Sequence, residues 1–161
     1  MTLLPDLFRH HRWANLTLID ALAALPPEEL ERRTPGGFGN IHETLHHLVL
    51  NETRFIDVMH GGTVPPPGPK DLLPLSELRG LASAQGDVLT EFAERFVEGD
   101  RLTGTFQGNA YDFPAYIPLF QAYHHGVEHR TNITTILATY DLPVPNLDLW
   151  SYQQAKESAA R

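Results

Sequence analysis

Apolar residues recur at three- and four-residue steps in four long stretches of the 161-residue chain, which is the period of an amphipathic helix. The predicted helices cover residues 3–25, 41–59 and 76–97, and a fourth begins near Pro114 or Pro118 and ends near Tyr140. Proline is tolerated in the first turn of a helix, so either proline can lie at the start of the fourth. No convincing set of strands accompanies these segments. The pattern therefore predicts an all-α fold, a single four-helix-bundle domain over residues 1–161.

Several helix boundaries are marked by residues that cap or break helices. Asn40 and Glu43 have the spacing of a capping box at the start of the second helix, and the pair Gly61-Gly62 is expected to end it. Ser76 is the expected N-cap of the third helix. Residues 102–113 are compatible with a short hairpin or with a loop, and the sequence leaves both open.

The connection between the second and third helices has an unusual composition. Residues 63–74 contain five of the thirteen prolines and show no helical period, which indicates an extended segment. At roughly 3.3 Å per residue, such a segment can run the length of a helix of about 18 residues. A long Pro-rich crossover could therefore let the third helix lie parallel to the second.

Charge and composition exclude several classes of function. Twelve Lys and Arg against twenty Asp and Glu give a net charge of −8, which repels phosphate backbones and anionic lipids, so we expect no nucleic-acid partner. No apolar run approaches the roughly 20 residues of a membrane span. We therefore expect a cytoplasmic protein that does not associate with membranes. The chain has no cysteine, so only histidine can supply nitrogen or sulfur ligands to a metal.

Histidines cluster in the fourth predicted helix. At about 100° per residue, His129 lies at the centre of the apolar stripe and His125 about 40° to one side, whereas His124 lies roughly 140° away and should face outward. Two imidazoles four residues apart on a core-facing stripe can bind one metal ion together. They can equally be buried histidines hydrogen-bonded to their neighbours, because buried polar groups need partners.

The second predicted helix offers three further histidines. His42 and His46 fit the H-E-x-x-H pattern, in which two histidines bind zinc and the Glu is the general base of a peptidase. This is the weaker interpretation, because Glu43 already has a capping role and both histidines lie off the centre of the apolar stripe. His47 lies on the opposite flank of the stripe from His46, and helical periodicity does not choose between them.

Four phrases, in order along the chain, resemble the DinB family of DNA-damage-inducible and related metal-dependent proteins. The first helix contains HRWANLTLIDALAALPPEEL, which is similar to the family's W-A-N opening and leucine-rich run. The register of IHETLHHLVLNE, a histidine followed by apolar residues and an acid, selects His47 together with Glu52. The phrase HHGVEHRTNITTIL resembles the family's H-x-x-x-H-R and selects His125 and His129, and the tail LDLWSY is similar to the family's closing segment.

The resemblance implies an up-down-down-up bundle in which His47, His125 and His129 bind a divalent metal such as zinc or nickel, frequently in a homodimer. Relatives in the wider superfamily are thiol-dependent transferases or isomerases. The resemblance therefore favours a metal-dependent S-transferase that uses a low-molecular-weight thiol and a small-molecule substrate. A metal-dependent hydrolase and a non-catalytic, metal-stabilised stress-response protein are the alternatives.

No catalytic residue is identified by the sequence, but two are candidates. Glu52 could orient a metal ligand or act as a base, although an acid on this helix is more often simply solvated or paired with Arg54 or Arg130. His11 lies near the apolar stripe of the first helix, about 40° from Leu7. It could be a fourth metal ligand or a proton carrier.

Overall fold

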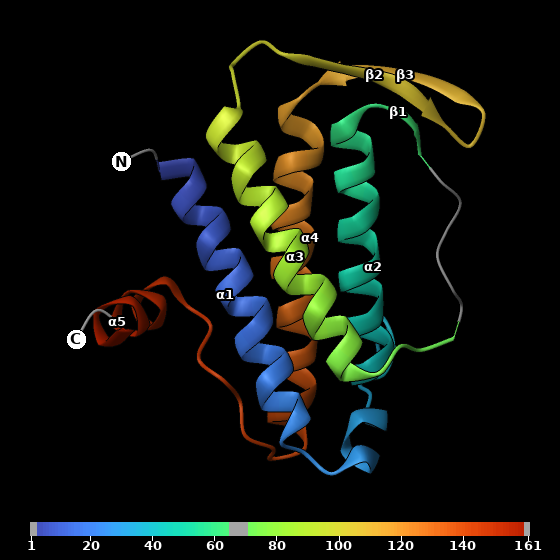
Figure 1. Cartoon of the computed structure of the whole chain (residues 1–161). Coiled ribbons are helices and arrows are strands. Elements are labelled where there is room, and N and C mark those ends of the chain that lie inside the picture. Colours follow the sequence, from blue (N-terminus) through green and yellow to red (C-terminus); the bar gives the residue numbers. More distant parts are fainter. Residues whose placement is uncertain (1–2, 65–70, 160–161) are drawn as a thin grey trace.

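The computed structural model describes residues 3–64 and 71–159. Four long helices lie side by side, and α1 and α4 run in one direction while α2 and α3 run in the other (Figure 1). Their bounds are Leu3–Ala23 for α1, Ile41–His60 for α2, Leu75–Arg95 for α3 and Tyr116–Thr139 for α4. Helix α1 packs mainly on α3, and α2 packs mainly on α4. The expected Pro-rich crossover between α2 and α3 lies partly outside the described residues, at 65–70.

The fold is mostly helical, but the all-α prediction is wrong in that a small sheet covers one end of the helices (Figure 1). Strand β1 (Gly62–Val64) pairs in parallel with β2 (Arg101–Phe106), which pairs antiparallel with β3 (Asn109–Pro114). Of the two possibilities left open for residues 102–113, the hairpin is correct. Its turn consists of Gln107 and Gly108, both with positive φ (50° and 81°), as expected for a two-residue hairpin turn.

The predicted capping box at the start of α2 is confirmed. The Asn40 side chain accepts a hydrogen bond of 2.7 Å from the backbone N–H of Glu43, and the Glu43 carboxylate accepts one of 2.8 Å from the backbone N–H of Asn40. The N-cap prediction for Ser76 is wrong, because α3 begins at Leu75 with Pro74 as its N-cap. Proline has a fixed φ near that of a helix and does not need a side-chain cap to start one.

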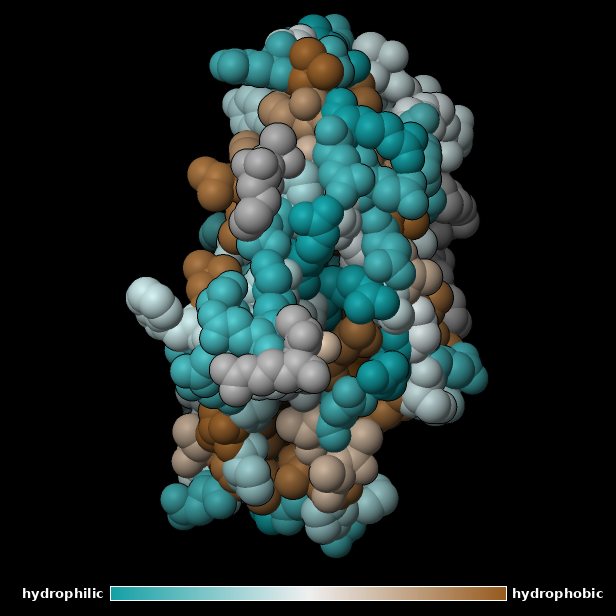
Figure 2. Space-filling view, turned by 60° about the vertical axis from the view of Figure 1, so that its left-hand side comes forward, coloured by the Kyte–Doolittle hydropathy of each residue, from teal (hydrophilic) through white to brown (hydrophobic). Residues whose placement is uncertain are grey.

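Two further helices were not predicted. A short 3-10 helix, η1 (Pro27–Glu31), follows α1, and α5 (Leu149–Ala159) lies beside α1 near the C-terminus (Figure 1). Helix α5 is attached through Tyr152, whose ring contacts those of His10 and Trp13 at centroid distances of 5.5 Å and 5.6 Å. The face that carries α1 and α5 is largely hydrophilic, with hydrophobic residues in small separate patches (Figure 2).

The core consists of two groups of buried apolar side chains. One group joins the four long helices toward the end of the bundle that lies away from the sheet (Figure 1), and includes Leu18, Leu45, Leu78 and Ile133. The other lies nearer the sheet and includes Phe8, Met59, Leu89 and Leu119. Among the residues that the structure describes, no helix is long and apolar enough to cross a membrane.

Candidate metal centre

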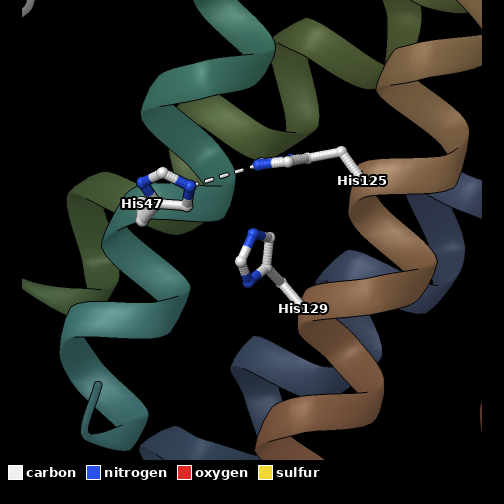
Figure 3. Close-up of side chains that lie close together, drawn as sticks. All are labelled: His47, His125 and His129. Carbon is white, nitrogen blue, oxygen red and sulfur yellow. Dashed lines mark hydrogen bonds between the residues drawn. The ribbon is translucent and has the colours of Figure 1, made fainter. Parts of the chain in front are cut away.

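Helices α2 and α4 bring three histidines together. One ring nitrogen from each of His47, His125 and His129 lies within 4.8 Å of the others, and the three rings point toward one another (Figure 3). The Nε2 atoms of His47 and His125 are 3.2 Å apart. Two imidazole nitrogens bound to one tetrahedral ion at about 2.05 Å would lie roughly 3.3 Å apart. This group, called the triad below, could hold a metal ion.

The sequence explains how the triad is assembled. His125 and His129 are one helical turn apart on the buried face of α4, as the apolar stripe predicts, and both are over nine-tenths buried. His124 is exposed, also as predicted. His47 lies on the side of α2 that packs against α4, so the structure groups His47, and not His46, with the two histidines of α4.

The electrostatics of the triad favour neutral imidazoles. Burial, with smaller contributions from the neighbouring His129 and His46, lowers the pKa of His47 to about 4. Burial likewise lowers the pKa of His125 to about 4, with smaller contributions from His129 and His47, and it lowers the pKa of His129. At neutral pH each ring therefore keeps one nitrogen lone pair free to bind a cation.

The donor set suits a divalent metal ion. Three neutral imidazoles that face one another have lone pairs to offer but few N–H groups to share. The Nε2 atoms of His47 and His125 face each other across the triad at 3.2 Å. A cation placed among the three rings would accept the nitrogen lone pairs that lack an N–H donor from a neighbouring ring. Nitrogen ligands of this kind are typical of zinc and nickel sites.

Two side chains that the sequence analysis did not single out surround the triad. The Phe38 ring lies against His47, with ring centroids 4.0 Å apart, and meets His129 edge-on at 5.2 Å. Phe38 belongs to the glycine-rich loop before α2 and is itself 53% exposed, so it covers the triad from the solvent side. The Asn51 amide nitrogen lies 2.8 Å from His47 Nε2 and 3.1 Å from Nδ1, one helical turn along α2.

The H-E-x-x-H interpretation, in which His42 and His46 would be the zinc ligands of a zincin-type peptidase, is not supported. His42 Nε2 lies 2.8 Å from the carbonyl oxygen of Leu73, in the segment that leads into α3. His46 is buried, and burial together with the nearby His42 lowers its pKa. Across residues 3–64 and 71–159, the triad is the only group of three or more His, Asp or Glu side chains close enough to hold a metal.

Behind the triad, a buried polar network joins α1, α2 and α4. Glu52 is fully buried, and its Oε1 lies 2.7 Å from His11 Nε2 and accepts a hydrogen bond of 3.0 Å from the Asn15 amide. Arg130 donates to Asn15 Oδ1 (2.6 Å) and contacts His11 Nδ1 at 3.2 Å. Because a guanidinium can only donate, His11 Nδ1 must accept, and the His11 proton must lie on Nε2 and point to Glu52.

This network settles how the two candidate catalytic residues are placed. His11 uses both ring nitrogens, since Nε2–H points to Glu52 and the Nδ1 lone pair accepts from Arg130, so neither nitrogen is available for a metal. Glu52 does not pair directly with Arg54 or Arg130 but reaches Arg130 through His11 and Asn15. Burial lowers the Arg130 pKa to about 10, and the charge of Glu52 opposes that shift.

Sequence reasoning named Arg130 only as a possible direct partner of Glu52 and missed Asn15, and one local signal in the sequence points to this network. Gly126 lies on α4 where the helix passes His11, and a Cβ at this position would overlap the His11 ring and lie 2.8 Å from the Arg130 guanidinium. A glycine inside a helix often marks such a close approach.

The fold and the triad define a mostly helical protein with a buried histidine site that could bind a metal ion. A model of the DinB family matches residues 1–160, so the chain belongs to the DinB family. A search of curated proteins finds no match to it.

Proposed function

We propose that the chain is a metal-dependent enzyme of the thiol S-transferase type, acting on a small electrophilic substrate. The observation that carries this proposal is the triad, which offers three neutral nitrogen ligands and no carboxylate. A closed structural zinc site has four protein ligands, whereas catalytic sites have three and keep one position open. A divalent ion held by His47, His125 and His129 would supply a Lewis acid that lowers the pKa of a bound water or thiol.

Each residue of the site would have a separate role. His47, His125 and His129 would hold the ion, zinc or nickel, and Phe38 would limit the access of bulk water to it. In the transfer, the thiolate sulfur forms a bond to an electrophilic carbon, the leaving group departs with its electron pair, and the thiol proton passes to solvent. Membership of the DinB family and the resemblance to thiol-using relatives favour this chemistry over metal-assisted hydrolysis.

Glu52 and His11 would act from behind the triad. Both are fully buried and hydrogen-bonded to each other, so they are placed to fix helices α1, α2 and α4 around the site. The Glu52 Oε2 atom makes no hydrogen bond within the described part of the chain, and the charge of Glu52 acts on His125. Outer carboxylates of this kind commonly orient metal-bound histidines.

Metal content and thiol binding test the proposal together. Protein purified without an affinity tag is loaded with zinc, nickel or cobalt, and bound metal is counted by elemental analysis. The cobalt form is titrated with cysteine while its visible spectrum is recorded, and turnover is followed with cysteine and 1-chloro-2,4-dinitrobenzene. We expect one metal per chain, a spectral change on thiol addition, and product formation that requires metal.

Matched variants on one helix make the test specific. His129→Ala is expected to lose metal and turnover, whereas His124→Ala, an exposed histidine on the same helix, should keep both. If the metal binds and raises the melting temperature but thiol leaves the cobalt spectrum unchanged, the transferase proposal is wrong. That result would favour the metal-stabilised protein, in which the ion cross-links α2 and α4.

A homodimer is a further proposal. Helix α4 exposes four large apolar side chains outside the core, each at 40–45% of its surface: Tyr116, Ile117, Phe120 and Val127. Light scattering coupled to size-exclusion chromatography would test it, and a monomer at high micromolar concentration would count against it.

A further inference from the structure

An apolar cavity of about 420 Å³ lies between the outer side of α2 and the β2–β3 hairpin. Its apolar walls are formed by Phe55, Val58, Phe106, Tyr111 and Phe113. Asn51 and Arg54 supply its polar lining, and the cavity is called the hairpin pocket below. Its volume falls within the range of roughly 300–1,000 Å³ that is typical of small-molecule sites.

The hairpin builds one wall of this pocket with ordered aromatic side chains. Tyr111 and Phe113 are two residues apart on β3, on one face of the strand, and their rings stack at 4.9 Å. The Tyr111 hydroxyl donates a hydrogen bond of 3.3 Å to the backbone carbonyl of Val58, which ties the hairpin to α2. Gly104 lies opposite Tyr111 on β2, and a Cβ there would overlap the Tyr111 ring.

Two residues of the hairpin pocket also contact the triad. Asn51 lies within hydrogen-bond distance of His47, and the Phe55 ring meets that of His125 edge-on at a centroid distance of 5.4 Å. Residues 47, 51, 55 and 58 follow one side of α2, about one helical turn apart. The pocket and the candidate metal centre are therefore adjacent, with Asn51 and Phe55 shared between them.

The charge next to the apolar walls is positive. The Arg54 guanidinium lies over the Phe106 ring at 5.1 Å, and no ion pair joins it to a carboxylate in the described part of the chain. The neighbouring triad contributes no negative charge. A guanidinium beside aromatic walls suits a ligand with an apolar ring and a carboxylate, because an Arg–carboxylate hydrogen bond is strong and directional.

We propose that the hairpin pocket binds the apolar part of the substrate, a small aromatic carboxylate whose ring lies among Phe55, Phe106 and Phe113 and whose carboxylate is bound by Arg54. This inference rests on the proposed function, since it assigns the substrate class for the site at the triad. Binding to the pocket itself involves no metal ligand, so it is testable with the metal-free protein.

The test uses 3-phenylpropanoate as the probe, with propanoate and 3-phenylpropan-1-ol as controls that lack the ring or the charge. Each is titrated into ¹⁵N-labelled protein, metal-free and zinc-loaded, and backbone amide shifts are followed by NMR. We expect 3-phenylpropanoate to shift amides of α2 and the hairpin in both forms and to bind more tightly than either control. Shifts confined to another region, or equal affinity for the acid and the alcohol, would overturn the proposal.

Variants separate the pocket from the metal centre. Arg54→Gln should weaken 3-phenylpropanoate binding about tenfold, as expected for loss of a charge-assisted hydrogen bond, and leave the alcohol unaffected. The matched control is Arg95→Gln, which removes a guanidinium from a different cavity and should change nothing. Val58→Trp should fill the pocket and abolish binding, and Phe113→Ala gives a second test if that variant does not fold.

The outcomes distinguish the two proposals. Unchanged affinity in Arg54→Gln and in a folded pocket variant refutes the hairpin pocket, whatever the triad does. If the natural chain binds 3-phenylpropanoate in the hairpin pocket but binds no metal or shows no turnover, only the proposed function is refuted.

Discussion

Replacing Glu52 with alanine is expected to destabilise the folded protein by about 3–5 kcal/mol, because it removes a buried carboxylate that accepts hydrogen bonds from His11 and Asn15 and offsets the charge of the buried Arg130. Glu52 is fully buried and Arg130 is 5% exposed, so water replaces little of the lost interaction. The substitution leaves the N–H groups of His11 and Asn15 without their acceptor, and each such unsatisfied donor costs about 1–3 kcal/mol. It also leaves the buried Arg130 without the carboxylate charge that opposes its desolvation.

Urea unfolding of metal-free protein, followed by circular dichroism at pH 7, measures this effect without a contribution from metal binding. Glu52→Gln keeps the size of the side chain and one acceptor but removes the charge, so its loss should be smaller than that of Glu52→Ala. The matched control is Glu91→Gln, which breaks an exposed pair with Arg95 on α3 and should cost no more than about 1 kcal/mol.

A double-mutant cycle shows whether the charge itself is responsible. Arg130→Met removes the cation, so Glu52→Gln should cost less in that background than in the natural chain, with a coupling of about 0.5–3 kcal/mol. A loss below about 1 kcal/mol for Glu52→Ala, or no coupling to Arg130, would refute the reasoning that Glu52 balances this buried cation.

Three other predictions follow from the site. His125→Ala should reduce bound metal to below one per chain by elemental analysis, whereas His46→Ala should retain it, and the reverse result would restore the zincin pair. The pKa values of His47 and His125 near 4 lie below the unfolded value near 6.5, so metal-free protein should lose stability as the pH falls from about 6.5 toward 4. A urea midpoint that is constant or rising over that range would contradict it. Gly126→Ala should cost about 1–3 kcal/mol by overpacking against the His11 ring, and an unchanged melting temperature would show that the ring can move aside.

Periodicity was sufficient to predict the four long helices and two of the three histidines of the triad. The apolar stripe of α4 placed His125 and His129 inward and His124 outward, because a long amphipathic helix has one way to bury its stripe. The choice of His47 over His46 came from the family resemblance. On the wheel both flank the stripe, and only the position of α4 beside α2 decides between them.

The features that were missed depend on contacts between segments far apart in the sequence. Strand β1 has three residues, too few to show an alternating pattern, and it exists because β2 lies beside it. Phe38 covers the triad because of the path that its glycine-rich loop takes. A loop has no helical or strand period, so the sequence pattern could not predict this position. The pairing of Arg130 with Asn15 spans 115 positions and joins two helices whose relative rotation is set by packing.

Helix α2 contributes residues to the triad, to the buried network and to the hairpin pocket, and this limits how its length can change. Inserting one residue after His47 would rotate everything beyond it by about 100°, and would turn Glu52 away from His11 and Phe55 away from the pocket at once. Helix α3 supplies none of these groups and is under no such constraint. Among relatives, we expect insertions and deletions to be tolerated in the connections and excluded between residues 47 and 58.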